Sequence, residues 1–342
     1  MTQPRIAIVP GDPAGIGPEL IAKLLEVDGV LNAANILLIG DSHLFERGGQ
    51  QAGLEVSLST LTEVDIISQE GLSHLEMDTI FPNDVKISEV TVEGGTTSLR
   101  CLDKALDLAQ LGLVDGVLFA PFNKSSMTIA GLNAEDEHKY MARYLGFKGY
   151  HSEINVLDEL MTTRVTSHIG IKDVAKKINQ DAVKRAVNLA NDTLLRAGNM
   201  RPRIAVAALN PHAGDNGKFG REEIDILEPA IKSFQELQMN VSGPWPSDTV
   251  FLKAQRGEVD AVVTMYHDQG QIAIKLMGFE RGVTVAGGLP IPIATPAHGT
   301  AFDIAGQNKA NVGATKQAFD LLEGFVLLLE GQAVFDCSPS NS

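Results

Sequence analysis

The chain has 342 residues, which is long for a single hydrophobic core and sufficient for two domains. Hydrophobic residues make up 44% and charged residues 21%, as in an ordinary globular protein. With 43 acidic and 28 basic residues the formal net charge is −15, which argues against nucleic acid or an anionic membrane as a partner.

Cysteine is rare, with only Cys101 and Cys337 present. No stretch has the pattern of a signal peptide, and no apolar run approaches the length of a membrane span. We therefore expect a protein of the reducing cytoplasm, without disulfides and outside the membrane.

The first predicted element is a buried parallel strand over residues 5–9, with the apolar, β-branched sequence RIAIV. A turn, GDPAGIGPE, spans residues 11–19, and helical spacing follows over 18–26. The glycine spacing fits neither the dinucleotide fingerprint GxGxxG nor the P-loop. We interpret the segment as a turn that starts a helix, and a phosphate loop is the less favoured alternative.

Short apolar strands alternate with helical segments along the rest of the chain, which predicts an α/β fold with mostly parallel sheets. The further strands are predicted at 35–40, 115–120, 153–160, 164–170, 203–209, 259–266 and 282–288. The further helices are predicted at 96–112, 181–198 and 221–238. There is no internal repeat or low-complexity block.

Three of the eight histidines, His168, His212 and His267, lie at the ends of predicted strands or in the turns after them. In open α/β sheets ligands bind beyond the carboxyl ends of the strands, so these positions suit a site. Their wide spacing excludes a zinc finger or an HExxH helix. If the fold gathers them, three imidazoles predict a catalytic Zn²⁺ site or a site for a related divalent ion. The alternative is that single histidines only hold loops.

Other polar residues follow strands near the histidines. Asp268 and Asp248 could orient a ligand or take a proton. Lys275 and Lys124 could bind an anionic substrate beside a metal, or be ordinary surface lysines.

The segment ATPAHGTAFDIAGQNKANVGA, residues 294–314, resembles the adenosine-binding loop of isocitrate and isopropylmalate dehydrogenases. Those enzymes also open with a strand followed by a turn similar to GDPAGIGPE. A glycine-rich connection with a helix N-cap at Asp303 is the structural alternative for this loop.

A longer series of motifs resembles the 4-hydroxythreonine-4-phosphate dehydrogenase family, over about residues 5–325. The motifs occur in the order GDPAGIGPE, APFNK, EHKY, TSHIG, LNPHAG, GPWPSDTVF, MYHDQGQIAIK, GFERGV and HGTAFDIAG. The resemblance implies a homodimeric, metal-dependent, NAD-linked β-decarboxylating dehydrogenase of the vitamin B6 pathway, with a site shared across the subunit interface. It also implies a two-domain isocitrate dehydrogenase-like fold, with a cofactor-side domain of 1–135 and 285–342, a metal, substrate and dimerisation domain of 136–284, and the active-site cleft between them.

The same resemblance assigns site residues. The metal ligands fall on His168, His212 and His267, the last expected to reach the partner subunit's site. The substrate contacts fall on His138, Lys139, Lys275, Thr284 and Ile293, and the candidate catalytic groups are Lys275, Asp268 and Asp248. The cofactor contacts fall on His298, Gly299, Thr300, Asp303 and Asn311. NAD is the expected cofactor, with NADP as an alternative, and zinc is the expected metal, with magnesium, manganese or cobalt as alternatives.

The sequence departs from the family at three substrate positions. The family usually has threonine, asparagine and arginine where this chain has Lys139, Thr284 and Ile293. Isoleucine cannot provide the bidentate phosphate contact of arginine, although Lys139 could supply a replacement charge. By resemblance we expect 4-hydroxythreonine 4-phosphate as substrate and 3-amino-2-oxopropyl phosphate as product. The departures leave a related substrate as the alternative, namely D-threonate or D-erythronate 4-phosphate or a cis-dihydrodiol carboxylate.

The implied reaction is hydride transfer from a secondary alcohol to NAD⁺, after which the β-keto acid loses CO₂. Lys275, or a water placed by Asp268, would then protonate the carbon. Phosphate acyltransferases share a related fold and give an alternative of another class, although they have no use for three histidines at strand ends. A binding protein that has lost turnover is a further alternative.

Overall fold

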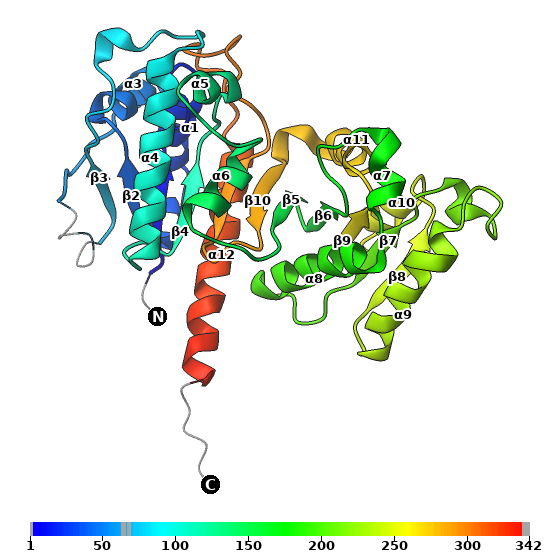
Figure 1. Ribbon diagram of the computed structural model, residues 1–342. Coiled ribbons are helices and arrows are strands. Elements are labelled where there is room, and N and C mark those ends of the chain that lie inside the picture. The colour runs from blue at the N-terminus through cyan, green and yellow to red at the C-terminus, as the bar shows by residue number, and fades with distance from the viewer. Residues whose placement is uncertain (1–2, 63–65, 67–69, 337–342) are drawn as a thin grey trace. The chain divides into compact units, whose positions relative to one another are not determined.

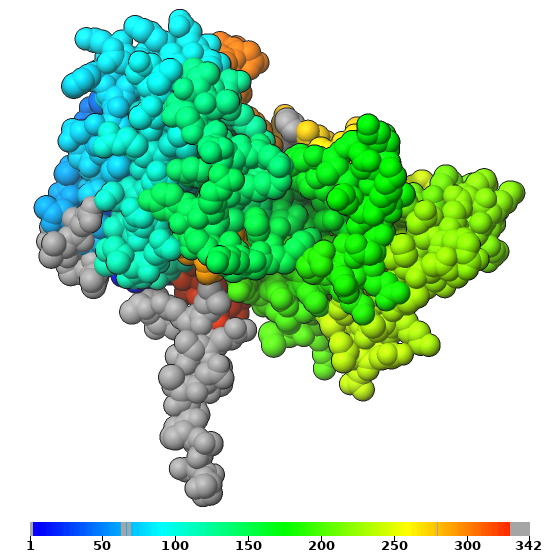
Figure 2. Space-filling model, in the orientation of Figure 1, coloured from blue at the N-terminus to red at the C-terminus, as the bar shows by residue number. Residues whose placement is uncertain are grey.

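The computed structural model describes residues 3–62, 66 and 70–336 (Figure 1). It divides into unit 1, Met1–Lys148 with Leu289–Ser342, and unit 2, Gly149–Gly288. Unit 2 is coloured green to gold in the space-filling view of Figure 2. The domain division of 1–135 with 285–342 and 136–284 stays a prediction.

Unit 1 is built on a parallel sheet whose strands are buried on both sides. Its strand order is β3 (Leu72–Leu75), β2 (Asn35–Ile39), β1 (Arg5–Val9), β4 (Gly116–Phe119) and β11 (Ile293–Pro296). Each neighbouring pair is parallel. Double burial explains why the strands have continuous apolar sequences instead of alternating ones.

Two helices of unit 1, α4 and α12, pack closely on its sheet. The helix α4 packs against β1, β2 and β4, whereas α12 packs against β4 and β11. The bounds are α1 (Gly17–Leu25), α2 (Val30–Ala33), α3 (Ser42–Ala52), α4 (Val92–Gln110), α5 (Lys124–Ile129), α6 (Glu137–Tyr144) and α12 (Gly313–Asp336).

Unit 2 has a mixed sheet. Its strand order is β10 (Val283–Gly287), β5 (Ser152–Leu157), β6 (Leu160–Arg164), β9 (Ala261–Thr264), β7 (Ile204–Ala207) and β8 (Val241–Trp245). β5 is antiparallel to β10 and to β6, whereas β6, β9, β7 and β8 are parallel neighbours. The helices are α7 (Ile171–Lys177), α8 (Gln180–Arg196), α9 (Glu228–Glu236), α10 (Val250–Gln255) and α11 (His267–Gly278).

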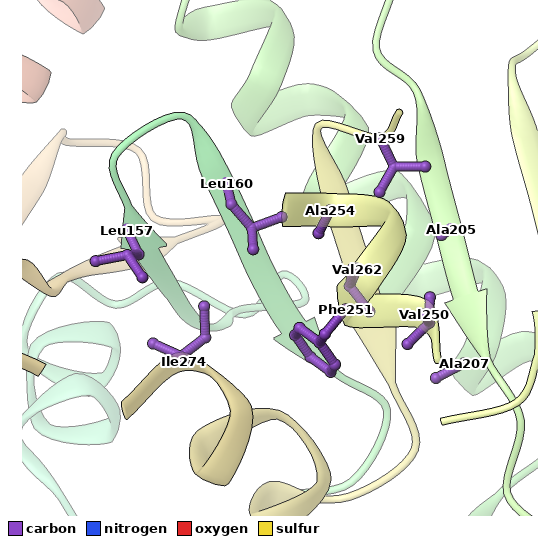
Figure 3. Close-up of a cluster of buried hydrophobic side chains, with 10 residues drawn as sticks. All are labelled: Leu157, Leu160, Ala205, Ala207, Val250, Phe251, Ala254, Val259, Val262 and Ile274. Carbon is purple, nitrogen blue, oxygen red and sulfur yellow. The ribbon is translucent and has the colours of Figure 1, made fainter. Parts of the chain in front are cut away.

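The core of unit 2 joins two of these helices to the sheet (Figure 3). Val250, Phe251 and Ala254 of α10 pack with Ile274 of α11 and Val262 of β9. Because α11 begins at a candidate metal ligand, this packing fixes the helix that carries His267. Within the described residues, no helix is long and apolar enough to cross a membrane.

The α/β class with mostly parallel sheets is confirmed, but two predicted strands are wrong in detail. Residues 153–160 do not form one strand, because Asp158 has a left-handed φ of 52° and the chain turns there from β5 into β6. The second strand, predicted at 164–170, is also wrong. β6 ends at Arg164, and residues 165–170 form the loop that follows it. The apolar pattern could not separate a hairpin from one longer strand.

Gly95 in α4 provides a test of the packing in unit 1. A Cβ at Gly95 would lie 2.0 Å from the Ser126 carbonyl oxygen, whereas one at Gly324 in α12 would meet nothing within 4 Å. We expect Gly95→Ala to lower the free energy of unfolding by about 1–3 kcal/mol through overpacking. Gly324→Ala should raise it by about 0.5–1 kcal/mol, as helix propensity dictates. Urea unfolding of both variants measures the difference, and equal effects would contradict this packing.

Candidate active site

His168 and His267 meet at one edge of the unit 2 sheet. His168 follows β6 and His267 follows β9, and these strands are parallel neighbours. Their ring centroids are 5.8 Å apart, and both rings line a pocket of about 190 Å³. Because a metal–imidazole nitrogen bond is about 2.0–2.1 Å long, this separation is short enough for one ion to lie between the rings.

The loops that carry the two histidines are joined by hydrogen bonds. The Thr166 backbone N–H and hydroxyl both donate to the Met265 carbonyl, at 3.1 and 2.7 Å. Gln269 accepts from the Met265 N–H at 2.7 Å and donates to the Ala208 carbonyl at 2.9 Å. These bonds connect the ends of β6, β9 and β7, so the pocket is built on a rigid frame.

The His267 ring is oriented by its neighbour in the chain. Its Nδ1 lies 2.6 Å from Asp268 Oδ1. When Nδ1–H donates to this carboxylate, Nε2 keeps its lone pair for a metal, as in many carboxylate–histidine–metal arrangements. Asp268 therefore acts on the site through His267 in this structure.

His212 lies after β7, in an unusual run of left-handed residues. Residues 212–217 all have positive φ, and four of these six residues are not glycine: His212, Ala213, Asp215 and Asn216. His168 also has a positive φ of 49°. Because such conformations cost about 1–2 kcal/mol for each non-glycine residue, both histidines are held in strained backbones.

A buried carboxylate holds the start of the His212 loop. Glu223 is 1% exposed, and its Oε1 accepts from the Leu209 and Asn210 N–H groups at 2.9 and 2.8 Å. Its Oε2 accepts from Asn210 Nδ2 at 2.9 Å. The three bonds compensate for burial of the charge and fix where the strained run begins.

The described part of the chain contains no cluster of three or more histidine, cysteine, aspartate or glutamate side chains close enough to hold a metal. The pair His168 and His267 fits one ion, but His212 is not brought to it within one chain. Binding by all three histidines therefore stays a prediction, as does the contribution from a partner subunit.

Three further candidates lie in unit 2. Asp248 is exposed and follows β8, the next parallel strand after β7. Lys275 is exposed on α11, two turns after His267. On β10, the Thr284 hydroxyl donates to Asn155 Oδ1 at 3.4 Å.

The helix α6 in unit 1 carries His138 and Lys139. The Asp136 side chain caps this helix by accepting from the Lys139 N–H at 2.8 Å. The Lys139 ammonium forms an ion pair with Glu135 on the protein surface. Its charge is therefore already partnered, although an exposed pair of this kind is weak and can be replaced. Lys124 lies 3.6 Å from Glu137 in a similar pair.

Ile293 is 0% exposed and lies on β11, in register with Val117 of β4. Its side chain belongs to the apolar interior of unit 1 and offers no hydrogen-bond donor. A role in substrate contact stays a prediction for this position.

The loop 298–311 is seated on α1 and on the turn before it. The Ile16 N–H donates to the Thr300 carbonyl at 3.1 Å. Glu19 accepts from the Ala310 N–H at 2.9 Å, and Lys23 donates both to Glu19 and to the Ala310 carbonyl. The opening turn is thus a platform for this loop. Because residues 302–308 form turns and α12 begins only at Gly313, the alternative of a helix N-cap at Asp303 is wrong.

Two ionisable groups near this platform have shifted pKa values. Burial raises the pKa of Asp12, which is 0% exposed, although its Oδ1 accepts from the Ala14 N–H at 2.9 Å. Burial lowers the pKa of His298, the first of the candidate cofactor contacts. The imidazole of His298 is therefore neutral at physiological pH, which suits hydrogen bonding more than attraction of phosphate.

Several positioning residues were missed by the sequence reasoning. Gln269, Glu223 and Glu19 touch no expected ligand, and each acts by holding a loop. Glu19 had a signal, since it is an acid in the first turn of a predicted helix. The other two are recognisable only once the strands and loops are assembled.

Comparison with known proteins decides the family. The model of the family described as pyridoxal phosphate biosynthetic protein PdxA matches residues 32–322. The chain belongs to this family. The family membership expected from the motifs is confirmed.

Relatives in the PdxA family are named as dehydrogenases. A 4-hydroxythreonine-4-phosphate dehydrogenase 2 of Pseudomonas aeruginosa is 52% identical over 93% of this chain and 96% of the relative. A D-threonate 4-phosphate dehydrogenase of Salmonella typhimurium is 38% identical over 91% of this chain and 95% of the relative. The crystal structure of a 4-hydroxythreonine-4-phosphate dehydrogenase from Klebsiella pneumoniae is 33% identical, covers 95% of this chain and 98% of its own, and has a TM-score of 0.82. The names of these relatives confirm the expectation that the chain is a dehydrogenase.

The Glu223 contacts predict that loss of this carboxylate loosens the His212 loop while the fold remains intact. Glu223→Gln replaces one acceptor with an amide group that cannot accept, so a buried donor of Leu209 or Asn210 loses its partner. We expect unfolding to become easier by about 1–3 kcal/mol and the His212 loop to exchange its amide hydrogens faster. Hydrogen exchange followed by mass spectrometry measures this, with the exposed Glu228→Gln as control. Equal exchange in both variants would contradict the role of Glu223.

The raised pKa of Asp12 predicts a pH dependence. The folded state binds the Asp12 proton more tightly than the unfolded chain does. Above the pKa of folded Asp12, the charged carboxylate therefore lowers the free energy of unfolding. This destabilisation disappears as the pH falls towards 3.8, where the carboxyl group is protonated in both states. We expect Asp12→Asn to be more stable than the wild type at neutral pH, with the difference shrinking on acidification. Unfolding free energies measured across this range test the sign, and a constant difference would argue against it.

Proposed function

We propose that the protein catalyses the metal-dependent, NAD-linked oxidation and β-decarboxylation of a small phosphorylated hydroxy acid. Membership of the PdxA family and the dehydrogenase names of its relatives support the reaction class. The observation that carries the proposal is the pairing of His168 and His267 in one pocket at the edge of the unit 2 sheet.

The first candidate substrate is 4-hydroxythreonine 4-phosphate, with 3-amino-2-oxopropyl phosphate as product. The name of the 52% identical relative supports it. The second candidate is D-threonate 4-phosphate, with D-erythronate 4-phosphate as a close variant. Thr284 and the buried Ile293 support a change of substrate, because neither offers the asparagine or arginine donors expected for the first candidate.

NAD is the proposed cofactor, and NADP is the alternative. The loop on α1 would hold its adenosine through His298, Gly299, Thr300, Asp303 and Asn311. The neutral imidazole of His298 and the backbone fixed by Ile16 and Glu19 support this role.

His168, His212 and His267 are the proposed metal ligands, with zinc as the preferred ion and magnesium, manganese or cobalt as alternatives. The 5.8 Å separation of the His168 and His267 rings supports one shared ion. Because His212 stands apart within one chain, we propose that the complete set forms in a homodimer with ligands from both subunits. The bound ion would polarise the substrate hydroxyl and stabilise negative charge on the ketone oxygen during decarboxylation.

The chain's own groups bind, orient and move protons. Asp268 holds His267 in its ligand tautomer, and Asp248 is the proposed base that takes the hydroxyl proton as hydride passes from carbon to NAD⁺. Loss of CO₂ leaves a carbanion equivalent that must gain a proton. Lys275 is the proposed acid for this step, and together with His138 and Lys139 it would also bind the substrate anions.

The alternative of a phosphate acyltransferase has no support among the named relatives, which are dehydrogenases. A reducing cytoplasm remains the proposed location. Cys101 is buried and free, as a reduced protein requires.

Substitution of the paired histidines tests the metal site. We expect His168→Ala and His267→Ala each to lose bound zinc and at least about 100-fold in kcat/KM, since a metal ligand and its charge are removed. Elemental analysis of the purified protein and NADH absorbance give the two readouts. His151→Ala is the matched control, because this histidine lies outside the candidate set. Full zinc content in both variants would overturn the assignment.

A substrate panel tests the reaction. The zinc-loaded protein with NAD⁺ should form NADH and release CO₂ with 4-hydroxythreonine 4-phosphate or with D-threonate 4-phosphate, compared with D-erythronate 4-phosphate and a cis-dihydrodiol carboxylate. Preference for D-threonate 4-phosphate would support the second candidate substrate and the view that Thr284 and Ile293 mark a change of substrate. Turnover that survives complete chelation would contradict metal dependence, and no turnover with any member would overturn the proposed function.

A further inference from the structure

A second polar pocket lies in unit 2, along one side of α8. It has a volume of about 290 Å³ and is lined by residues of α8 together with Tyr150 and Gly288. None of its lining residues belongs to the candidate active site. Its size suits a small metabolite more than a nucleotide.

The α8 residues of the pocket form one stripe on the helix. Arg185, Asn188, Asp192 and Arg196 follow the spacing of a single helix face, and all four are exposed. Between the ends of the stripe the helix rises by about 16 Å, at about 1.5 Å per residue. The Cα atoms of the two arginines are therefore far apart, with Asp192 between them, and both long side chains must turn inward to contact one small molecule.

The two guanidinium groups have no carboxylate partner among the residues that the structure describes, whereas Arg5, Arg164 and Arg203 each form an ion pair. Arg185 instead stacks on the ring of Tyr150, with its Cζ 5.5 Å from the ring centroid. This contact holds the cation in place without neutralising it. The pocket lining thus has two arginines and one aspartate, a positive balance that is unexpected on a chain with a net charge of −15.

The pocket floor is closely packed. Leu189 and Thr193 are buried beneath the arginines. A Cβ at Gly288 would lie 2.4 Å from the Tyr150 carbonyl oxygen and 3.3 Å from Leu189 Cδ1. This side of the pocket therefore requires glycine at position 288, and the close packing shows that the pocket is already formed without a ligand.

We propose that this pocket binds a small molecule with an anionic group at each end and a hydroxyl group between them, that is, a phosphorylated hydroxy acid. Arg185 and Arg196 would each bind one anionic group, and a planar guanidinium can bind a phosphate or a carboxylate through two hydrogen bonds. The carboxylate of Asp192 would accept from the central hydroxyl. A second site for this chemical class would let the concentration of such a metabolite act on the protein apart from the candidate active site.

The first experiment is calorimetric titration of the full-length protein with D-3-phosphoglycerate, which carries a carboxylate, a hydroxyl and a phosphate. Glycerol 3-phosphate and inorganic phosphate are the comparison ligands. We expect D-3-phosphoglycerate to bind at least about 10-fold more tightly than either, since only it can engage both arginines. Equal binding of inorganic phosphate would show that the pocket takes a single anion and would overturn the two-ended assignment.

Variants locate the binding. Arg185→Gln and Arg196→Gln should each weaken D-3-phosphoglycerate at least about 10-fold, whereas the exposed Arg201→Gln outside the pocket should leave it unchanged. Glutamine retains high helix propensity, and thermal unfolding checks that α8 is intact.

Binding that is lost in Lys275→Met and retained in both pocket variants would belong to the candidate active site and would overturn the proposal. The proposal would also be overturned if the pocket variants changed the sedimentation coefficient but not the affinity for D-3-phosphoglycerate. The arginines would then contact another copy of the chain instead of a ligand. NADH formation is measured separately, so failure here is distinct from failure of the proposed reaction.

Discussion

The parallel alignment of β6, β9, β7 and β8 is the constraint on which the candidate active site depends. Parallel strands end at the same edge of a sheet, so the loops that follow them are neighbours whatever their distance in sequence. His168 and His267 follow adjacent strands, and their rings are close for this reason. His212 follows β7, one strand further along, and its loop leaves the edge through a run of left-handed residues.

Buried polar side chains then give the edge its precision. Gln269 connects the ends of β9 and β7 with one amide, and Glu223 collects three donors at the start of the next loop. In unit 1, Glu19 performs the same task for the loop 298–311. Removal of a partner at any of these places would cost about 1–3 kcal/mol, because the polar group left behind would stay buried.

Much of this arrangement follows from sequence patterns, and some of it does not. The apolar strands and the polar residues after them predicted the α/β class and the edge that His168 and His267 share. The hairpin at Asp158 was missed because a left-handed aspartate leaves no periodic signal in an apolar stretch. Seating of the loop 298–311 on α1 joins residues nearly 300 positions apart, from Glu19 to Ala310, which no local pattern encodes. Metal binding by His212 stays a prediction, because the described residues hold no cluster of three ligands that includes it.

The burial of Ile293 limits which side chains can occupy this position. Its neighbour in register is Val117, so the position is part of the sheet's own packing. An arginine introduced here alone would place an unpaired cation in an apolar interior, which costs several kcal/mol or forces the strand to move. An arginine at position 293 therefore requires coordinated changes in the surrounding core. A single substitution there would disturb the sheet before it could supply a contact to any ligand.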